Sequence, residues 1–300
     1  MSQSPARAGV LLPFVLVALI WGSTWLVIKD QIAAIPPQWT IVWRFVLASA
    51  AMCVLARLRG ESLRLPPGGA RLAMAIGLAQ FCGNYQFVYQ AEHYLTSGLV
   101  AVFYALLLVP NAALSRLFLK TPVTPRFVLG SVVAVGGIAL LLLHEARMAV
   151  SHGGVVWGIA LSVFGLLAAS VANVLQAGPV ARRTPAVPLM AWAMIWGSAF
   201  DIVLALAVAG PPAVDWHPSY LAGVAYLAIF GSVVTFPLYF KLIRDLGAGR
   251  AAYNGVATPV VAMILSTLFE SYRWTLLAVA GSVLAMTGLV VALSARKPAA

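Results

Sequence analysis

Hydroxyl, amide and aromatic side chains recur within long apolar segments of this chain, often at the i, i+4 spacing that places two residues on one face of a helix. A cavity lined by tyrosine hydroxyls and amides is mostly uncharged, so it suits a zwitterion or an amphiphilic molecule that is bound weakly. The residues that we expect to bind such a small molecule are Trp21, Asn84, Tyr85, Tyr104, Asn173, Thr235, Tyr239, Tyr253 and Asn254.

Each of these side chains also has a purely structural interpretation. Asn, Gln, Ser and Thr in membrane helices often form hydrogen bonds with a neighbouring helix and so hold a bundle together. That interpretation suits any single residue as well as a binding role does. The set as a whole favours a cavity, because polar faces recur on corresponding segments in the two halves of the chain.

Two prolines and two charged residues complete the set of candidates. Pro110 and Pro259 each remove a backbone donor within an expected helix, which indicates either a hinge or a static bend. Arg44 lies roughly 10 Å from the end of its apolar segment at 1.5 Å per residue, within the reach of a snorkelling side chain. Asp201 lies at a similar depth. Both are candidates for coupling or structural charges, because an ionisable residue inside a membrane is a functional candidate by default.

The composition places these residues in a membrane. Of the 300 residues, 62% are hydrophobic and 9% are charged, whereas a soluble domain carries about 25% charged residues. We therefore expect a multi-pass protein of the cell inner membrane, with the lipid bilayer as its solvent. The net charge of +11 does not indicate a nucleic-acid partner, because the basic residues lie singly between apolar segments and form no patch.

Apolar segments of about 20 residues, the length that crosses a bilayer as a helix, fill the chain. They do not alternate as the strands of a membrane barrel would. They predict an all-α membrane protein with ten transmembrane helices, at residues 10–28, 38–56, 72–90, 97–118, 127–143, 155–176, 188–208, 220–240, 251–269 and 275–293.

Lysine and arginine residues predict the orientation of this bundle. If the N-terminus is cytoplasmic, 15 of the 19 basic residues lie on the cytoplasmic side and three lie on the other side. Basic residues accumulate in cytoplasmic loops. We therefore expect both termini in the cytoplasm and an even number of helices.

The two halves of the chain resemble each other. A shift of 151 residues pairs, without a gap, Leu114-Ser115 with Leu265-Ser266, Leu117-Phe118 with Leu268-Phe269, and Gly130 and Gly137 with Gly281 and Gly288. We predict a first five-helix repeat at 1–150 and a second at 151–300. Five is an odd number, so the second repeat is inverted, as in alternating-access carriers whose substrate site lies between the halves. The seven-residue spacing of the glycines predicts close helix packing.

The order of these residues resembles the EamA-type branch of the drug/metabolite transporter superfamily over nearly the whole chain. The resemblance rests on Trp21-Gly22-Ser23 with Lys29, Arg44-Phe45-Val46-Leu47-Ala48, Ala91-Glu92-His93-Tyr94-Leu95-Thr96-Ser97, and then Tyr239, Gly247-Ala248, Ala252, Pro259, Glu270, Thr275, Gly281 and Gly288. It implies that the third, fourth, eighth and ninth helices line a central cavity, which the first and sixth close. It implies a peripheral second and seventh helix, which favours a structural role for Arg44 and Asp201. It also implies export of amino acids or similar molecules.

We therefore predict a secondary transporter that exports small metabolites, amino acids foremost, by alternating access, with no cofactor and no metal. The alternative is a membrane-embedded enzyme that acts on a lipid or isoprenoid substrate, but G-x-S-x-G, H-E-x-x-H and paired-acid motifs are absent from the sequence. A channel would need a charged ring or a filter loop, and ATP-driven transport would need a Walker A motif. The sequence indicates no oligomeric state.

Overall fold

The computed structural model describes residues 5–148, 152–246 and 254–294, and within these ranges the chain forms helices and no strand. The predicted all-α class is confirmed. The elements are α1 (Pro5–Gln31), α2 (Pro37–Leu58), α3 (Gly69–Ile76), η1 (Gly77–Asn84), α4 (Tyr85–Ala91), α5 (Ser97–Tyr104), η2 (Ala105–Leu107), α6 (Leu108–Leu119), α7 (Pro125–Met148), α8 (His152–Ala177), α9 (Pro179–Arg182), α10 (Ala186–Val208), α11 (Pro218–Ala228), η3 (Ile229–Val234), α12 (Thr235–Leu246), α14 (Asn254–Phe269) and α15 (Leu276–Ser294).

Helices form along the apolar segments because lipid offers the backbone no hydrogen-bonding partner, so each segment must satisfy its own N–H and C=O groups. Several helices begin at a proline: α2, α7 and α11 begin at Pro37, Pro125 and Pro218. Proline is tolerated there because the N–H groups of the first helical turn have no acceptor within the helix. In the described part of the chain, eight helices are long and apolar enough to cross a membrane, and α14 is a shorter apolar helix. The predicted segment 72–90 corresponds to the continuous run of α3, η1 and α4.

Two of the long helical segments contain a π-helix. The η1 segment separates α3 from α4, and the η3 segment separates α11 from α12. Moving residues 229–234 of η3 back by the 151-residue offset of the repeat places them at 78–83, inside η1. The same irregularity therefore occurs at matching positions of the two halves. Turns of π-helix are rare and often lie at functional sites.

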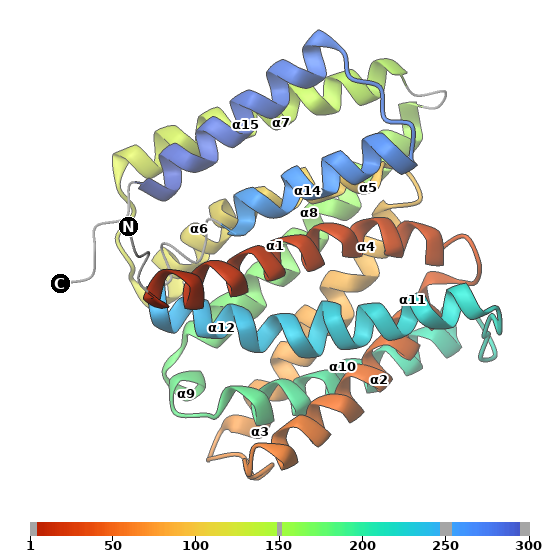
Figure 1. Ribbon diagram of the computed structural model, residues 1–300, viewed down its shortest axis with the longest axis vertical. Helices are drawn as coiled ribbons and strands as arrows, with labels where there is room; N and C mark the ends of the chain where they lie inside the picture. Colours follow the sequence, from red (N-terminus) through yellow and green to blue (C-terminus); the bar gives the residue numbers. More distant parts are fainter. Residues whose placement is uncertain (1–4, 149–151, 247–253, 295–300) are drawn as a thin grey trace.

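The helices lie side by side and define two ends of the bundle (Figure 1). The end that we call distal carries the turns at 32–36, 92–96, 209–217 and 270–275, on the right of the view. The end that we call proximal carries the start of α1 and the connections at 59–68 and 120–124. The pair α7 and α15 lies along one side, and α2, α3 and α10 lie on the opposite side.

Buried apolar side chains form two large clusters. One joins α1, α2, α3, α4 and α10 with η1, and the other joins α5, α7, α8, α14 and α15. Trp25 and Tyr104 pack against both clusters, so they lie at the junction between them. Large apolar side chains such as Leu129, Val203 and Leu268 are exposed, as positions that face lipid are expected to be.

Helices α7 and α15 approach each other backbone to backbone along their glycines. A Cβ atom on Gly137 would lie 2.6 Å from the carbonyl oxygen of Gly281, and one on Gly130 would lie 2.6 Å from that of Gly288. The close packing predicted from the glycine spacing is confirmed, and it is of the kind that small residues allow between membrane helices.

Candidate functional site

A tryptophan, a tyrosine and an asparagine meet at the junction of the two apolar clusters. The Tyr104 hydroxyl, at the end of α5, donates to Asn84 Oδ1, at the end of η1, over 2.8 Å. The rings of Tyr104 and Trp25 lie 5.3 Å apart between centroids. The indole N–H of Trp25 is buried and has no hydrogen-bond partner within the described ranges. Two predicted site residues are thus brought together, with a free donor beside them.

Arg44 of α2 lies in a second cluster, next to Tyr85, Tyr89 and Ser232. Its guanidinium donates to the hydroxyls of Tyr89 at 3.2 Å, Tyr85 at 3.4 Å and Ser232 at 3.4 Å. It also lies over the ring of Tyr85, 4.5 Å from the centroid. The side chain is 1% exposed. The expectation that Arg44 snorkels toward the membrane surface is therefore wrong: hydroxyls of two other helices hold its charged group inside the bundle.

Trp21 joins α1 to η3 and α12. Its indole N–H donates to the carbonyl oxygen of Gly231 over 3.3 Å. Its ring lies 5.1 Å from the ring of Tyr239 and 5.8 Å from that of Phe236, between centroids. The structure thus places two more predicted site residues, Trp21 and Tyr239, against each other.

Other predicted site residues bond within or between helices. The Thr235 hydroxyl donates to Gly231 O in its own helical segment. Asn173 Nδ2 donates to Asn111 Oδ1 over 3.4 Å, which links α8 to α6.

Asn254 at the start of α14 is bonded in the same way. Its Nδ2 group donates to Phe14 O over 2.9 Å, which links α14 to α1, and its Oδ1 atom accepts from Thr258. These hydrogen bonds, within and between helices, are the kind expected if the side chains only hold the bundle together. Tyr253 lies outside the residues that the structure describes.

Asp201 of α10 is fully buried against α4. One carboxylate oxygen accepts a hydrogen bond from Gln86 Nε2 over 2.9 Å, and the other has no partner among the residues described. The side chain is 0% exposed. This contact ties α10, which carries Asp201, to α4 in the third helical segment.

The distal end is closed by a polar cluster that the sequence patterns did not single out as a unit. Lys29 Nζ donates to the backbone carbonyls of Glu92 and Leu95. The backbone N–H of Ser97 and its hydroxyl donate to the Glu270 carboxylate, which caps the start of α5. Together these bonds join α1, α14 and the turn between α4 and α5.

Glu92 lies within this closure with 0% of its surface exposed, and neither carboxylate oxygen has a hydrogen-bond partner in the part of the chain that the structure describes. Burial raises the pKa of Glu92 well above its ordinary value; the charge of Lys29 opposes this rise and that of Glu270 adds to it. A carboxyl group in these surroundings favours its neutral, protonated form.

Burial differs between the two ends of the fourth helical segment. In α5, every residue from Ser97 to Phe103 is buried. In α6, which continues the same segment toward the proximal end, no residue is fully buried. This segment is therefore tightly packed at its distal end and looser at its proximal end.

The two prolines predicted as hinges have different surroundings. Pro110 lies near the start of α6, directly after the 3₁₀ segment η2. A proline removes a donor and clashes with the carbonyl four residues earlier, here Leu106 within η2, so the local tightening has a simple cause. Pro259 is buried inside α14, which continues unbroken around it. The hinge role of either residue remains a prediction.

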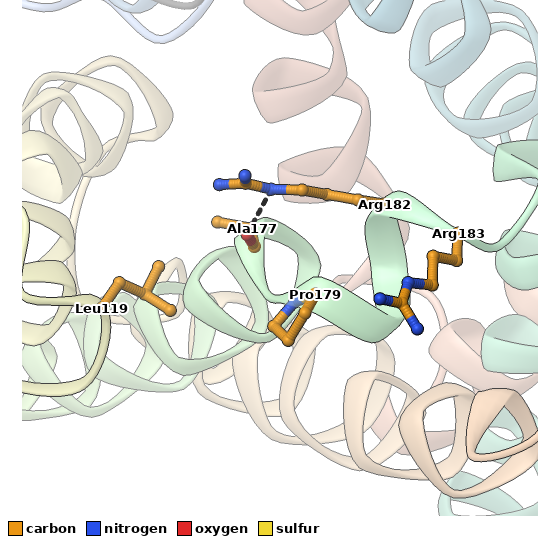
Figure 2. A pocket seen from close by; sticks show the side chains of 5 residues that line it. All are labelled: Leu119, Ala177, Pro179, Arg182 and Arg183. Atoms are coloured by element: carbon orange, nitrogen blue, oxygen red, sulfur yellow. Dashed lines mark hydrogen bonds between the residues drawn. The ribbon is translucent and has the colours of Figure 1, made fainter.

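Two cavities lie apart from these clusters. One of about 320 Å³ is lined by Leu119, Ala177, Pro179, Arg182 and Arg183, where α6, α8 and α9 end. Figure 2 shows Arg182 extended across it, with Nε donating to the Ala177 carbonyl. A groove of about 560 Å³ runs between α6 and α7 and is mostly apolar. Neither is lined by a residue predicted to bind substrate.

Comparison with known proteins identifies the class. The EamA-like transporter family matches residues 8–143 and again residues 156–294. The chain is 25% identical over 275 residues to Protein PagO of Salmonella typhimurium, which covers 89% of this chain and 86% of that protein. It is 29% identical over 262 residues to the uncharacterized inner membrane transporter YedA of Escherichia coli K12, covering 83% and 79%.

The chain belongs to the EamA-like transporter family. A solved crystal structure has the same fold, with a TM-score of 0.70 over 95% of this chain and 96% of that chain at 18% sequence identity. The family and the names of the relatives indicate a transporter rather than the membrane enzyme considered as the alternative. The predicted family resemblance is confirmed.

Sequence patterns missed several residues that the fold brings to the centre. Trp25 was not selected, although its i, i+4 spacing from Trp21 could have indicated it. The hydroxyls of Ser23 and Tyr226 lie 2.6 Å apart, but they are 203 positions apart in sequence, and no local pattern relates them.

Proposed function

We propose that the protein is a secondary transporter that exports small metabolites, with amino acids as the first substrate class, by alternating access between its two halves. Residues 1–150 and 151–300 act as inverted repeats in this proposal. A carrier of this design holds its substrate near the middle of the membrane, at the interface of the repeats.

The matching π-helices are the observation that carries the proposal. The η1 and η3 segments occupy equivalent positions under the 151-residue offset. Side chains at both segments converge on Arg44, because Tyr85 directly follows η1 and Ser232 lies within η3. The family match, which occurs once in each half of the chain, supports the same division.

The proposed topology has ten membrane-spanning helices. They are the eight long helices together with α14 and the segment Gly69–Ala91. The proximal end is cytoplasmic in this proposal, because most Lys and Arg residues belong to that side. The membrane is the cell inner membrane, as the name of the Escherichia coli relative states for that protein.

The packing suits one state of an alternating-access cycle. The polar cluster around Lys29 and Glu270 and the buried α5 close the distal end. The opposite half of the same helical segment, α6, is not fully buried at any residue. In this proposal the structure is closed to the outside, and substrate enters from the cytoplasm between α6 and its neighbours.

An amino acid suits the groups that line the centre. The Tyr104 hydroxyl, the Asn84 amide and the free indole N–H of Trp25 can bond polar groups, while the aromatic rings contact an apolar side chain. Few full charges are present, so binding is weak enough for release.

Counterflow in proteoliposomes tests this function. Vesicles are loaded with one unlabelled amino acid at a time, and uptake of a labelled amino acid is followed. Transient accumulation that depends on the internal amino acid and is absent from protein-free vesicles is the expected result. Absence of counterflow for every amino acid with folded, reconstituted protein refutes the amino-acid assignment. Asn84→Ala removes the Tyr104 acceptor and should reduce counterflow without loss of folded protein.

A further inference from the structure

Arg44 is the largest side chain that the bundle buries completely, at 1% exposure. A buried cation loses its hydration, and the effective cost in proteins is several kcal/mol unless a partner of opposite charge or good hydrogen bonds compensate it. Ionisable residues inside membrane proteins commonly lie on a substrate or ion pathway for this reason.

The contacts that Arg44 makes are weak ones for a guanidinium. The three bonds within the described residues go to neutral hydroxyls at 3.2, 3.4 and 3.4 Å, whereas charge-assisted bonds to a carboxylate are about 2.7–2.9 Å long. Nε is buried and donates to no group among the residues that the structure describes. No carboxylate of the described chain bonds this side chain. The donors are thus only partly satisfied.

The guanidinium lies where the two halves of the chain meet. Nη1 donates to Tyr89 and Nη2 donates to Tyr85, both in the first half of the chain. Nη2 also donates to Ser232 in the second half. Gly231 lies beside this contact: a Cβ atom there would touch Nη2 at an ordinary 3.5 Å and would crowd a methyl group of Thr24 at 2.9 Å.

Tyr85 lies under the guanidinium and packs against the same apolar cluster as Trp25 and Tyr104. It is half-buried. It directly follows Asn84, whose Oδ1 atom accepts from Tyr104, so its backbone adjoins the candidate site.

We propose that Arg44 binds the carboxylate of the transported molecule, which makes carboxylate-bearing small molecules the substrate class. This inference rests on the proposed transport function. The free Nε–H and the weakly held Nη2–H form one edge of the guanidinium fork, and that edge matches the two oxygens of a carboxylate. In the closed state the hydroxyls of Tyr85 and Ser232 accept hydrogen bonds from this edge, and these bonds break when the two halves separate.

Three labelled probes with one phenylalkyl frame distinguish the groups that Arg44 recognises. They are L-phenylalanine, with a carboxylate and an ammonium group, 3-phenylpropanoate, with the carboxylate alone, and phenethylamine, with the ammonium group alone. Transport is measured in proteoliposomes for the wild type, Arg44→Gln and Arg44→Lys. Arg57→Gln is the matched control, because it removes one exposed arginine at the proximal end of the same helix, α2. Thermal unfolding of each purified variant reports whether it is folded.

The expected result is a wild type that transports the two carboxylates in preference to phenethylamine. Arg44→Gln then raises the half-saturation concentration of both carboxylates by about 10- to 100-fold, the loss expected for a bond to a charged group. It leaves phenethylamine within about twofold. Arg44→Lys gives an intermediate value, because a lysine keeps the charge without the fork. A purely structural role lowers transport of all three probes equally, which overturns the inference.

The remaining outcomes separate this inference from the proposed function. Carboxylate transport that Arg44→Gln leaves unchanged overturns the role of Arg44 alone. Preferred transport of phenethylamine overturns both the role of Arg44 and the amino-acid assignment. Failure of folded protein to transport any of the three probes overturns the role of Arg44 in recognising these carboxylates, and counterflow with the other amino acids then tests the proposed function. Recovery of Arg44→Gln by Glu92→Gln shows that Arg44 serves Glu92 in another state instead of a substrate.

Discussion

The glycine contact between α7 and α15 allows a sharp test of how this bundle is held together. Gly136 and Gly137 are neighbours in α7, so replacement by alanine changes helix propensity equally at both positions, by about 1 kcal/mol in favour of alanine in a soluble helix. Their surroundings differ. A Cβ atom on Gly137 would lie 2.6 Å from Gly281 O and 2.7 Å from Ala285 Cα, whereas one on Gly136 would find its nearest atom, Leu284 Cδ2, at 4.0 Å.

The atoms that block a side chain at Gly137 belong to the backbone of α15, so no rotamer change can remove the clash. The nearest of these atoms is Ala285 N, 2.2 Å from that Cβ position. Normal contact therefore requires the two helices to separate locally by about 1 Å, and overpacking of this kind costs about 1–3 kcal/mol. The propensity contributions cancel between the two variants. We therefore expect Gly137→Ala to be less stable than Gly136→Ala by about 1–3 kcal/mol, or roughly 2–10 °C in melting temperature.

Thermal unfolding of the purified variants in one detergent measures this difference, with tryptophan fluorescence as the signal. Gly136→Ala should equal or exceed the wild type. Equal melting temperatures for Gly137→Ala and Gly136→Ala would show that α7 and α15 separate freely, and the reasoning from close glycine packing would then be wrong.

Four further results are expected. Tyr104→Phe keeps the ring but leaves the Asn84 amide oxygen without its donor, so counterflow should fall about tenfold, while Tyr94→Phe on the exposed distal turn should transport as the wild type does. Asp201→Asn should retain transport under a pH gradient, because Gln86 can still bond the amide; complete loss with folded protein would instead indicate proton coupling. Glu92→Gln should flatten the pH dependence of stability, because a carboxyl whose pKa is raised on folding stabilises the fold most at acid pH and loses that contribution as the pH rises. The variant should be more stable than the wild type near pH 8 by about 1–3 kcal/mol, the cost of one unsatisfied buried group, and this difference should vanish near pH 4. The same difference in stability at both pH values would contradict this. Reporter tags at both termini should indicate the cytoplasm, and an external C-terminus would overturn the ten-helix topology.

Sequence alone determined the class of this protein, for a physical reason. The free energy of placing an apolar segment in lipid depends on its own length and composition, so the spans can be read locally. Glycine spacing predicted the α7–α15 contact in the same way, because only residues without bulky side chains allow such an approach.

Only the tertiary structure decided which polar side chains face each other. The sequence treated Asn84, Thr235 and Asn254 alike, yet Asn84 accepts from Tyr104 at the centre, Thr235 bonds its own helix and Asn254 joins α14 to α1. Arg44 lies at a depth that permits snorkelling, but hydroxyls 41 to 188 positions away draw it inward. A hydrogen bond depends on atoms within about 3 Å, and no local pattern contains the partners that folding brings from other helices.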